Sequence, residues 1–390
     1  MKPKIFQKQF FSFAIFFIFS VFVFADVSNA KKKFIKGNIF DKIASLKEAN
    51  ENEKFSLAKT ALHFSLDAHE SLQNDAELSS LVNEAVSSIS ANDINHLNYS
   101  EKKELAEILF ESFKTFSNDE VRISILKKVS ELKDGIPFEE FVNALHHFLE
   151  NEKSQTQVVK TAIETLGKIG NANSFRLLYN AKQTGAWISF STEIDDALLN
   201  LSDKSFPVIQ ELIESDEKSL KTLFDLFEKT EKISNYFKCE IAENVLSNAI
   251  YKLDGKFSKE SVAVEMKSLD IIVQNKWTRA SKVVLDFFPR AEKEFEKALM
   301  SAEEFSRVIR AVASVSPLDG SAVLLKKLSD LNKQKESGIV VSEELVLSLI
   351  DSLGFIGDKS AFDTLLYVTY INYSDAVIAR AREALSRLKW

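Results

Sequence analysis

The sequence has little of several residues on which whole classes of protein depend. Its 390 residues include one cysteine, 10 glycines, 5 prolines and 5 histidines. A β-sandwich or barrel needs turn residues about every ten positions, which this chain cannot supply. The single cysteine, Cys239, excludes an intramolecular disulfide. It lies in an apolar stretch and is expected in the core, with an intermolecular disulfide or a reactive thiol as the alternative.

Motifs that carry chemistry are scarce as well. The sequence contains neither a Gly-x-Ser-x-Gly nucleophile motif nor a phosphate-binding loop. His63, Asp67 and Glu70 share one helix face and would suit a metal, but a solvated polar face is the simpler interpretation. His146 and His147 are neighbours, which point about 100° apart on a helix and cannot chelate one ion together. We therefore predict no catalytic residue, no metal site and no cofactor.

What remains is a composition that favours helices. Apolar residues make up 45% of the chain and charged residues 27%, which is typical of a folded, soluble protein. Abundant Leu, Lys, Glu, Ala and Ser, with few helix breakers, predict that nearly all of the chain is helical. Phenylalanine occurs 32 times, and outside the N-terminus it is expected mainly in the core.

The N-terminus has the layout of a secretory signal peptide. Three lysines in the first eight residues precede an apolar run of 16 residues, Phe10–Ala25. Small residues suitable for cleavage lie before Asp26 and before Lys31. The run is shorter than the ~20 residues of a spanning helix. We expect residues 1–30 to be a cleaved signal peptide; an uncleaved anchor, which would make the protein a membrane-anchored envelope assembly factor, is the alternative.

Export and charge restrict the partners. Removal of residues 1–30 leaves 47 basic and 56 acidic residues, a net charge of −9. Nucleic-acid binding needs clustered basic residues, so an acidic exported chain is a poor candidate for it. The local cluster Lys31–Lys33 with Lys36 is expected to be a solvated tail. The expected location is the periplasm or cell envelope, or outside the cell, with membrane contact only if the N-terminal segment is not cleaved.

One unusual phrase occurs twice in the chain. Glu164–Leu178 reads ETLGKIGNANSFRLL, and Asp351–Leu366, which begins 187 residues later, reads DSLGFIGDKSAFDTLL. Apolar residues spaced as on one helix face precede each copy. Gly170 and Gly357 follow the last apolar position, where a left-handed residue ends a helix at little cost. The pattern predicts a helix, a tight turn and a second helix.

The other glycines and serines of the phrase lead to further expectations. Gly167 and Gly354 fall inside the first helix, where glycine costs ~1 kcal/mol relative to alanine. We expect that the close approach of the returning second helix compensates this cost. Ser174 and Ser360 are expected to cap that second helix.

The pattern resembles the HEAT repeat, particularly the short bacterial HEAT-like units. Weaker copies of the phrase can be aligned with these two at the residue that precedes the first glycine. In the aligned copies this position recurs at intervals of 37, 32, 114, 41 and 32 residues. The aligned positions are Val129, Leu166, Leu198, Val312, Leu353 and Leu385. Because 114 is three times 38, two further repeats are expected, near positions 236 and 274. The resemblance covers Ser117–Trp390; residues 31–116 are helical in pattern and are either divergent repeats, which we favour, or a capping bundle.

The resemblance implies an all-α fold: a right-handed α-solenoid of stacked antiparallel helix pairs, HEAT-like or armadillo-type. It also implies a non-catalytic scaffold that holds a protein partner on the concave face formed by the second helices. Some HEAT-like proteins are lyases acting on tetrapyrroles or DNA-repair glycosylases, but export and negative charge disfavour both. The candidate contact residues on these helices are Arg176, Asn180, Lys326, Lys327, Asp363 and Tyr367.

Overall fold

The computed structural model describes residues 29–389, apart from 73–74, 153, 216, 229 and 253–254. The expected signal peptide therefore lies outside the described residues except for its last two positions. The described residues are almost entirely helical, and their only extended pairing is an isolated bridge between Asp358 and Lys389. This confirms the prediction of a nearly all-helical chain.

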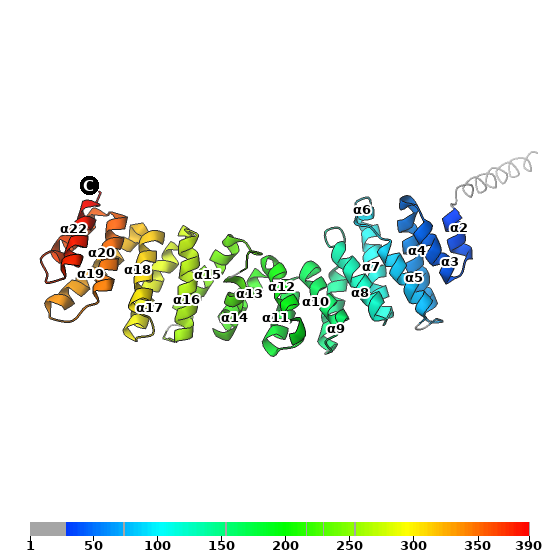
Figure 1. Ribbon diagram of the computed structural model, residues 1–390, viewed down its shortest axis with the longest axis horizontal. Coiled ribbons are helices and arrows are strands. Elements are labelled where there is room, and N and C mark those ends of the chain that lie inside the picture. The colour runs from blue at the N-terminus through cyan, green and yellow to red at the C-terminus, as the bar shows by residue number, and fades with distance from the viewer. Residues whose placement is uncertain are drawn as a thin grey trace, which may run out of the picture. The chain divides into compact units, whose positions relative to one another are not determined.

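The chain divides into two compact units, Met1–Leu201 and Ser202–Trp390, which are described separately (Figure 1). The helices of the first unit are α2 (Asn29–Lys36), α3 (Ile39–Glu48), α4 (Glu51–His69), α5 (Ala76–Ser87), α6 (Ala91–Ile94), α7 (Tyr99–Thr115), α8 (Asp119–Glu131), α9 (Glu139–Asn151), α10 (Gln157–Ile169), α11 (Ala172–Thr184) and α12 (Ser191–Leu201). Those of the second unit are α13 (Phe206–Ser215), α14 (Glu217–Glu228), α15 (Asn235–Tyr251), α16 (Lys259–Gln274), α17 (Ser281–Glu296), α18 (Ala302–Val315), α19 (Pro317–Glu336), α20 (Glu343–Ile356), α21 (Phe362–Val368) and α22 (Asp375–Ser386).

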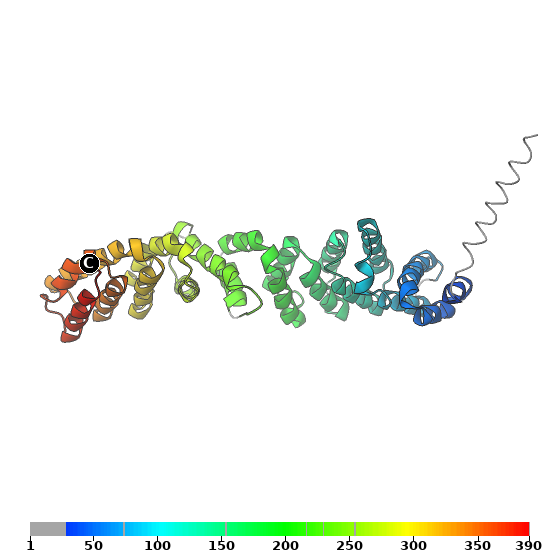
Figure 2. The same ribbon diagram turned by 90° about the horizontal axis from the view of Figure 1, so that it is seen from above.

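Within each unit the helices alternate between two rows, which are seen from above in Figure 2. In the first unit α3, α5, α8, α10 and α12 pack one on the next and form the first-helix row, while α4, α7, α9 and α11 form the second-helix row. In the second unit α14, α16, α18, α20 and α22 form the first-helix row. Its second-helix row contains α13, α15, α17, α19 and α21. The chain is therefore a helical repeat protein.

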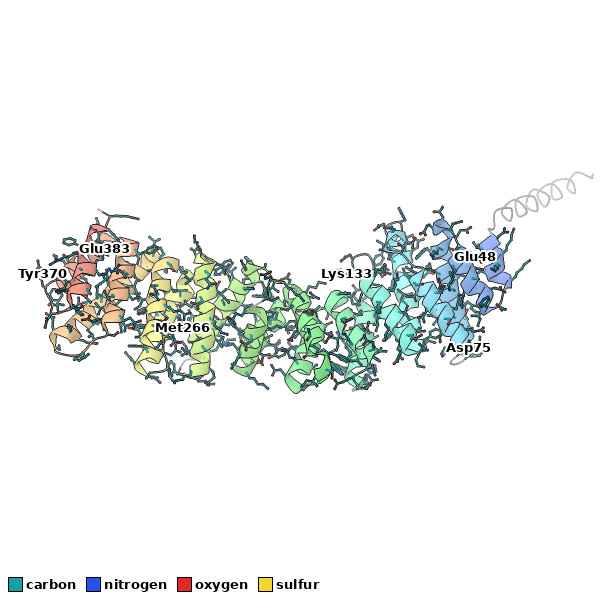
Figure 3. The ribbon with its side chains drawn as sticks, in the orientation of Figure 1. Glu48, Asp75, Lys133, Met266, Tyr370 and Glu383 are labelled. Atoms are coloured by element: carbon teal, nitrogen blue, oxygen red, sulfur yellow. The ribbon has the colours of Figure 1, made fainter. Side chains whose placement is uncertain are left out.

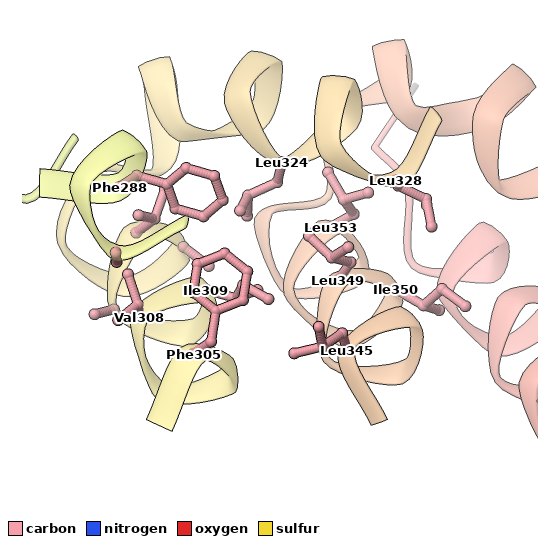
Figure 4. Packing of buried hydrophobic residues seen from close by; sticks show 14 of the residues in the cluster. Phe288, Phe305, Val308, Ile309, Leu324, Leu328, Leu345, Leu349, Ile350 and Leu353 are labelled. Atoms are coloured by element: carbon pink, nitrogen blue, oxygen red, sulfur yellow. The ribbon is translucent and has the colours of Figure 1, made fainter. Parts of the chain in front are cut away.

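The helix pair that packs most closely is not the pair joined by the repeated phrase. Each second helix packs more extensively on the first helix that follows it, as α11 does on α12 and α19 on α20, than on the first helix that precedes it. In Figure 4, Leu324 and Leu328 of α19 lie close to Leu349 and Leu353 of α20. Buried residues of this kind form a continuous core along the second unit, from Ala242 to Leu388.

The glycines inside the first helices do mark a close approach, but not of the expected helix. A Cβ atom at Gly167 would lie 2.7 Å from Ala197 Cα on α12, and one at Gly354 would lie 2.9 Å from Ala384 Cβ on α22. The neighbour is thus the next first helix, and the expectation of the returning second helix is wrong. The reason is the two-row stacking, in which successive first helices share their long faces.

The two turns differ from each other. Gly357 ends α20 with φ +71°, which confirms the left-handed expectation. Gly170 has φ −70° and an extended backbone, so the same expectation is wrong there. The residues expected to cap the second helices, Ser174 and Ser360, are not the N-caps. The Asn171 side chain caps α11, with Ser174 as its capping-box partner, and the Asp358 side chain accepts the Ser360 N–H.

The two repeats inferred within the interval of 114 residues exist, one of them displaced. The first helix α16 ends at Gln274, as expected. The preceding first helix, α14, ends at Glu228, and Tyr236 instead lies in the first turn of the second helix α15. The expectation near 236 is wrong because α15 has 17 residues whereas α11 has 13, which lengthens this repeat.

Single residues of the core are buried and bonded as follows. Cys239 is buried, as expected, and burial raises the pKa of its thiol. Trp187 is buried and donates its indole N–H to the Glu152 carbonyl at 3.1 Å. Trp277 donates to the Glu243 carboxylate at 2.8 Å. Both tryptophans thus connect neighbouring repeats.

Candidate functional site

The six expected contact residues lie on second-row helices: Arg176 and Asn180 on α11, Lys326 and Lys327 on α19, and Asp363 and Tyr367 on α21. Asn180, Lys326 and Asp363 are exposed. Arg176 is half-buried in the first unit. Whether these side chains contact a partner stays a prediction.

Two of the six side chains are already engaged within the second unit. Lys327 forms an ion pair with Glu292 of α17 at 2.8 Å, and its ammonium lies 5.7 Å from the centre of the Phe305 ring. The Tyr367 hydroxyl donates a hydrogen bond to Glu336, and this bond raises the pKa of the phenol. Lys327 and Tyr367 therefore stabilise the stack, and of the four candidates on this unit Lys326 and Asp363 are the more accessible.

The second unit has a groove on its first-helix row, a surface on which no site was predicted. Its volume is about 560 Å³, and α16, α18, α20 and α22 form its walls. Figure 3 labels Met266 on α16 and Glu383 on α22, the two outer helices of this set. The lining residues are Leu269, Asp270, Val273, Arg307, Arg310, Ala311, Ala313, Ser314, Asp351, Ser352, Phe355, Arg380 and Arg387. We refer to this surface as the arginine groove.

Helical periodicity places these residues together. Arg307, Arg310 and Ser314 are spaced by three and four residues, so they share one face of α18. Asp351 and Phe355 share a face of α20 in the same way, and Arg387, which directly follows α22, lies seven residues after Arg380 of that helix. Because the first helices pack one on the next, these faces join into one surface. The Ser301 capping box with Glu304 fixes the start of α18.

The cations of the arginine groove are not equally available. Arg307 pairs with Asp270, and Arg387 pairs with Glu383. Arg380 lies 3.4 Å from Asp351 and 3.6 Å from Glu383, measured between nitrogen and oxygen. Arg310 is exposed and forms no ion pair with any residue that the structure describes. Exposed ion pairs contribute ~0–1 kcal/mol each, so a ligand can exchange with them at little cost.

The floor of the groove is apolar. Leu269, Val273 and Ala311 line it, and Phe355 of α20 is 69% exposed beside them. A single exposed apolar side chain is common on protein surfaces, so Phe355 is of interest only because it adjoins this groove. Ser352, in the wall, is 3% exposed, and its Oγ has no hydrogen-bond partner among the described residues. A buried hydroxyl in this state costs about 1–3 kcal/mol.

Sequence reasoning missed this surface because the resemblance directed attention to the second helices. Two signals were present. The spacing of Arg307, Arg310 and Ser314 places two arginines on one solvent-facing stripe. Phe355 lies between the two glycines of the second phrase, at a position that points away from the apolar face of its helix.

The pair His146 and Ser174 has the residue types of a catalytic site, but its contacts are those of a helix cap. His146 Nε2 lies 2.7 Å from Ser174 Oγ, a distance typical of a nucleophile and its base. Ser174 is fully buried, however, and its hydroxyl also accepts the Asn171 N–H, so it belongs to the cap of α11. His147 is exposed, so only His146 of the two neighbours lies at the edge of the core.

The polar face expected on α4 lies close to α7. His63 Nε2 is 3.6 Å from Glu104 of α7, and Lys59 pairs with the same carboxylate at 2.6 Å. Within the described residues, no group of three His, Cys, Asp or Glu side chains is placed to hold a metal. In the same part of the chain, no helix combines the length and apolar character of a membrane span.

A buried charge cluster lies between α16 and α17. Arg290 is 6% exposed and lies 2.9 Å from Glu265 and 3.0 Å from Glu294. It also donates to the carbonyls of Ala249 and Lys256, which close the loop after α15. Burial, and then the negative charge of Glu265, raise the pKa of Glu294 to about 8. One arginine thus serves two carboxyl groups, of which Glu294 is protonated at neutral pH.

Comparisons with known proteins add little to this description. No protein-family model matches the sequence, and no curated protein matches it. A solved structure described as "Circular tandem repeat protein with novel repeat topology and enhanced subunit contact surfaces" aligns with 89% of this chain and 87% of its own length. The identity is 13% and the TM-score 0.23, too low to carry an argument. The assignment as a helical repeat protein rests on the two rows of helices.

Proposed function

We propose that the protein is an exported, non-catalytic helical-repeat scaffold that binds a protein partner in the cell envelope. The observation that carries this proposal is the arginine groove. It combines an apolar floor, an exposed Phe355 and an Arg310 that has no ion pair among the described residues, in about 560 Å³. Binding surfaces of helical repeats extend over successive repeats, as this groove does over four first helices.

The finer type of repeat is also a proposal. We infer HEAT-like, armadillo-type repeats wound into a right-handed superhelix. The order of first helix, tight turn and second helix, with the Leu-Gly-x-Ile-Gly phrase at two of the turns, supports this assignment. A crystal structure that gave a left-handed superhelix would contradict it.

Export is proposed from the N-terminal sequence. Of the two cleavage positions, the one before Lys31 falls within α2, whereas the one before Asp26 leaves this helix whole. We therefore favour Asp26 as the first residue of the mature protein. N-terminal sequencing of the protein from the cell envelope tests this, and an intact Met1 on membrane-bound protein would favour the anchored alternative.

Site-specific photocrosslinking tests the binding function. A photoreactive phenylalanine analogue replaces Phe355 in the full chain, and intact cells are irradiated. We expect a covalent adduct with a protein partner that disappears with Arg310→Glu. Arg382→Glu is the matched control, because Arg382 is an exposed arginine of α22 outside the groove.

The same analogue at Asn180 and at Lys326 tests the second-helix surface of each unit. An adduct from Lys326 but not from position 355 would move the site to the second helices of the second unit. An adduct at 355 that survives Arg310→Glu would contradict the role given to the groove.

A further inference from the structure

We propose that the occupant of the arginine groove is an acidic peptide segment with an apolar side chain at its centre, supplied by a partner protein. This inference rests on the proposed function and adds the chemistry of the partner. Its strongest support is the choice of basic residue. The chain has 50 Lys and Arg residues, and only nine of these are arginines: Arg122, Arg176, Arg279, Arg290, Arg307, Arg310, Arg380, Arg382 and Arg387.

Four of these nine arginines line this one groove, and no lysine does. A guanidinium presents a planar fork of donors that matches a carboxylate with two parallel hydrogen bonds, whereas an ammonium is a compact point charge. A surface selected only for solubility would draw on the far more abundant lysines. The arginine groove therefore has the chemistry of carboxylate recognition.

The arrangement of charge argues against larger polyanions. Asp270 and Asp351 lie in the same walls and repel a continuous phosphate backbone. The full chain also has a net charge of −7, which opposes nucleic acid and anionic lipid surfaces at long range. Separate carboxylates on a peptide can instead meet Arg310 and exchange with the existing pairs of Arg307 and Arg380 one at a time.

The floor of the groove requires more than charge. Val273 and Phe355 offer apolar surface between the arginines, so the bound segment needs an apolar side chain flanked by acidic ones. A volume of about 560 Å³ lies in the range of typical ligand sites.

A random dodecapeptide library displayed on phage and selected on the purified full-length protein tests this inference. We expect enriched peptides to carry Asp or Glu on both sides of a Leu, Ile or Phe residue. Fluorescence anisotropy of an enriched peptide should show at least tenfold weaker binding to Arg310→Glu and to Phe355→Ser. Arg382→Glu should bind it unchanged, and circular dichroism should show that all variants are folded.

Three outcomes would overturn the inference. These are selected peptides without acidic residues, binding that Arg310→Glu leaves intact, and displacement of the peptide by single-stranded DNA or anionic vesicles at lower concentration than by the peptide itself. If crosslinking from position 355 captures a partner and the library gives no acidic peptide, the proposed function stands and the acidic-peptide inference falls. If neither succeeds, both fall.

Discussion

Gly167 in the first unit and Gly354 in the second occupy the same place in two stacks. Each lies on the penultimate helix of its first-helix row, and each is in contact with an alanine of the last helix, Ala197 on α12 or Ala384 on α22. Each copy of the repeated phrase therefore packs against the last helix of the first-helix row in its unit. This placement explains why the copies are 187 residues apart.

The turns that follow these glycines show that the likeness does not extend further. In the first unit the chain leaves α10 through an extended Gly170 and an Asn171 capping box. In the second it leaves α20 through a left-handed Gly357 and a short 3-10 turn at Lys359–Ala361. The shared sequence thus follows the contact between first helices, and the local residues after it select the turn.

Buried charge also separates the two units. In the first unit Lys42 and Lys128 are buried, and each donates to a backbone carbonyl at 2.6 Å. In the second, Arg290 is buried between two carboxyl groups. Lys128 also pairs with the Glu131 carboxylate at 2.8 Å, so one carboxylate matches its charge. Arg290 instead faces two carboxyl groups, and the pKa of one of them, Glu294, is raised to about 8. The second unit should therefore respond more strongly to alkaline pH.

Cutting the chain gives the largest expected effect. A fragment that ends after Asp203 retains the whole first unit and should stay helical, since no first-unit helix loses its neighbour within that unit. A fragment that ends between Leu166 and Phe175 loses α11 and α12, so it should lose much more helix per residue.

Circular dichroism of the two fragments measures this difference. Loss of nearly all helix from the fragment that ends after Asp203 would contradict two separately folded stacks. It would favour a single globular domain held by contacts between distant segments.

Alanine at the two packed glycines gives the next largest effect. In an exposed helix, Gly→Ala stabilises by ~1 kcal/mol. At Gly354 and Gly167 the new Cβ meets the next helix, so we expect destabilisation, by about 1–3 kcal/mol as for other overpacked cores. Gly167→Ala should be the worse of the two, because its Cβ meets the Ala197 Cα at 2.7 Å, a backbone atom that cannot rotate away.

Urea denaturation measures both changes. Adding Ala384→Gly to Gly354→Ala should restore part of the stability, which separates the contact from a general effect of the helix. Lys168→Ala, at an exposed position of α10, is the control and should change little. A Gly354→Ala variant more stable than the parent would exclude the close approach.

The pH dependence of the second unit comes from Glu294. Its pKa is raised to about 8 in the folded chain, against an ordinary value of 4.5. The folded state thus holds a proton that the unfolded state releases above pH 4.5, and stability falls as the pH rises from there through 8. Glu294→Gln keeps the neutral form, so its unfolding midpoint should stay level over this range.

Thermal unfolding at pH 6 and pH 9 compares the parent with Glu294→Gln. Glu292→Gln, on the same helix, is the control; it removes a half-buried carboxylate that pairs with Lys327 and should leave the pH slope as it is. Equal slopes in the parent and Glu294→Gln would show that Glu294 is ionised in the folded chain.

The sequence was enough to predict features that repeat along the chain. It was not enough to predict features that depend on which helices pack together. Helical periodicity and scarce breakers predicted the helices, and the phrase placed α10, α11, α20 and α21. The partner of Gly167 could not be predicted, because nothing in one helix states which later helix lies against it. The arginine groove was missed for the same reason, since its residues come from four helices that meet only in the stack. The position of the first helix α14 was predicted wrongly because the second helices differ in length and follow no fixed period.

The smallest expected effect distinguishes the two turns. At Gly357, with φ +71°, an L-residue is strained by about 1–2 kcal/mol, and asparagine tolerates this region better than other residues. Stability should therefore fall in the order Gly, Asn, Ala, Val at position 357. At Gly170 the backbone is extended, and any Cβ meets the Leu166 carbonyl oxygen at 2.4 Å. Asn and Ala should then cost the same amount at position 170. Urea midpoints of the variants at both positions measure these differences; an advantage of Asn over Ala at 170, or its absence at 357, would mean that the two turns do not differ as described.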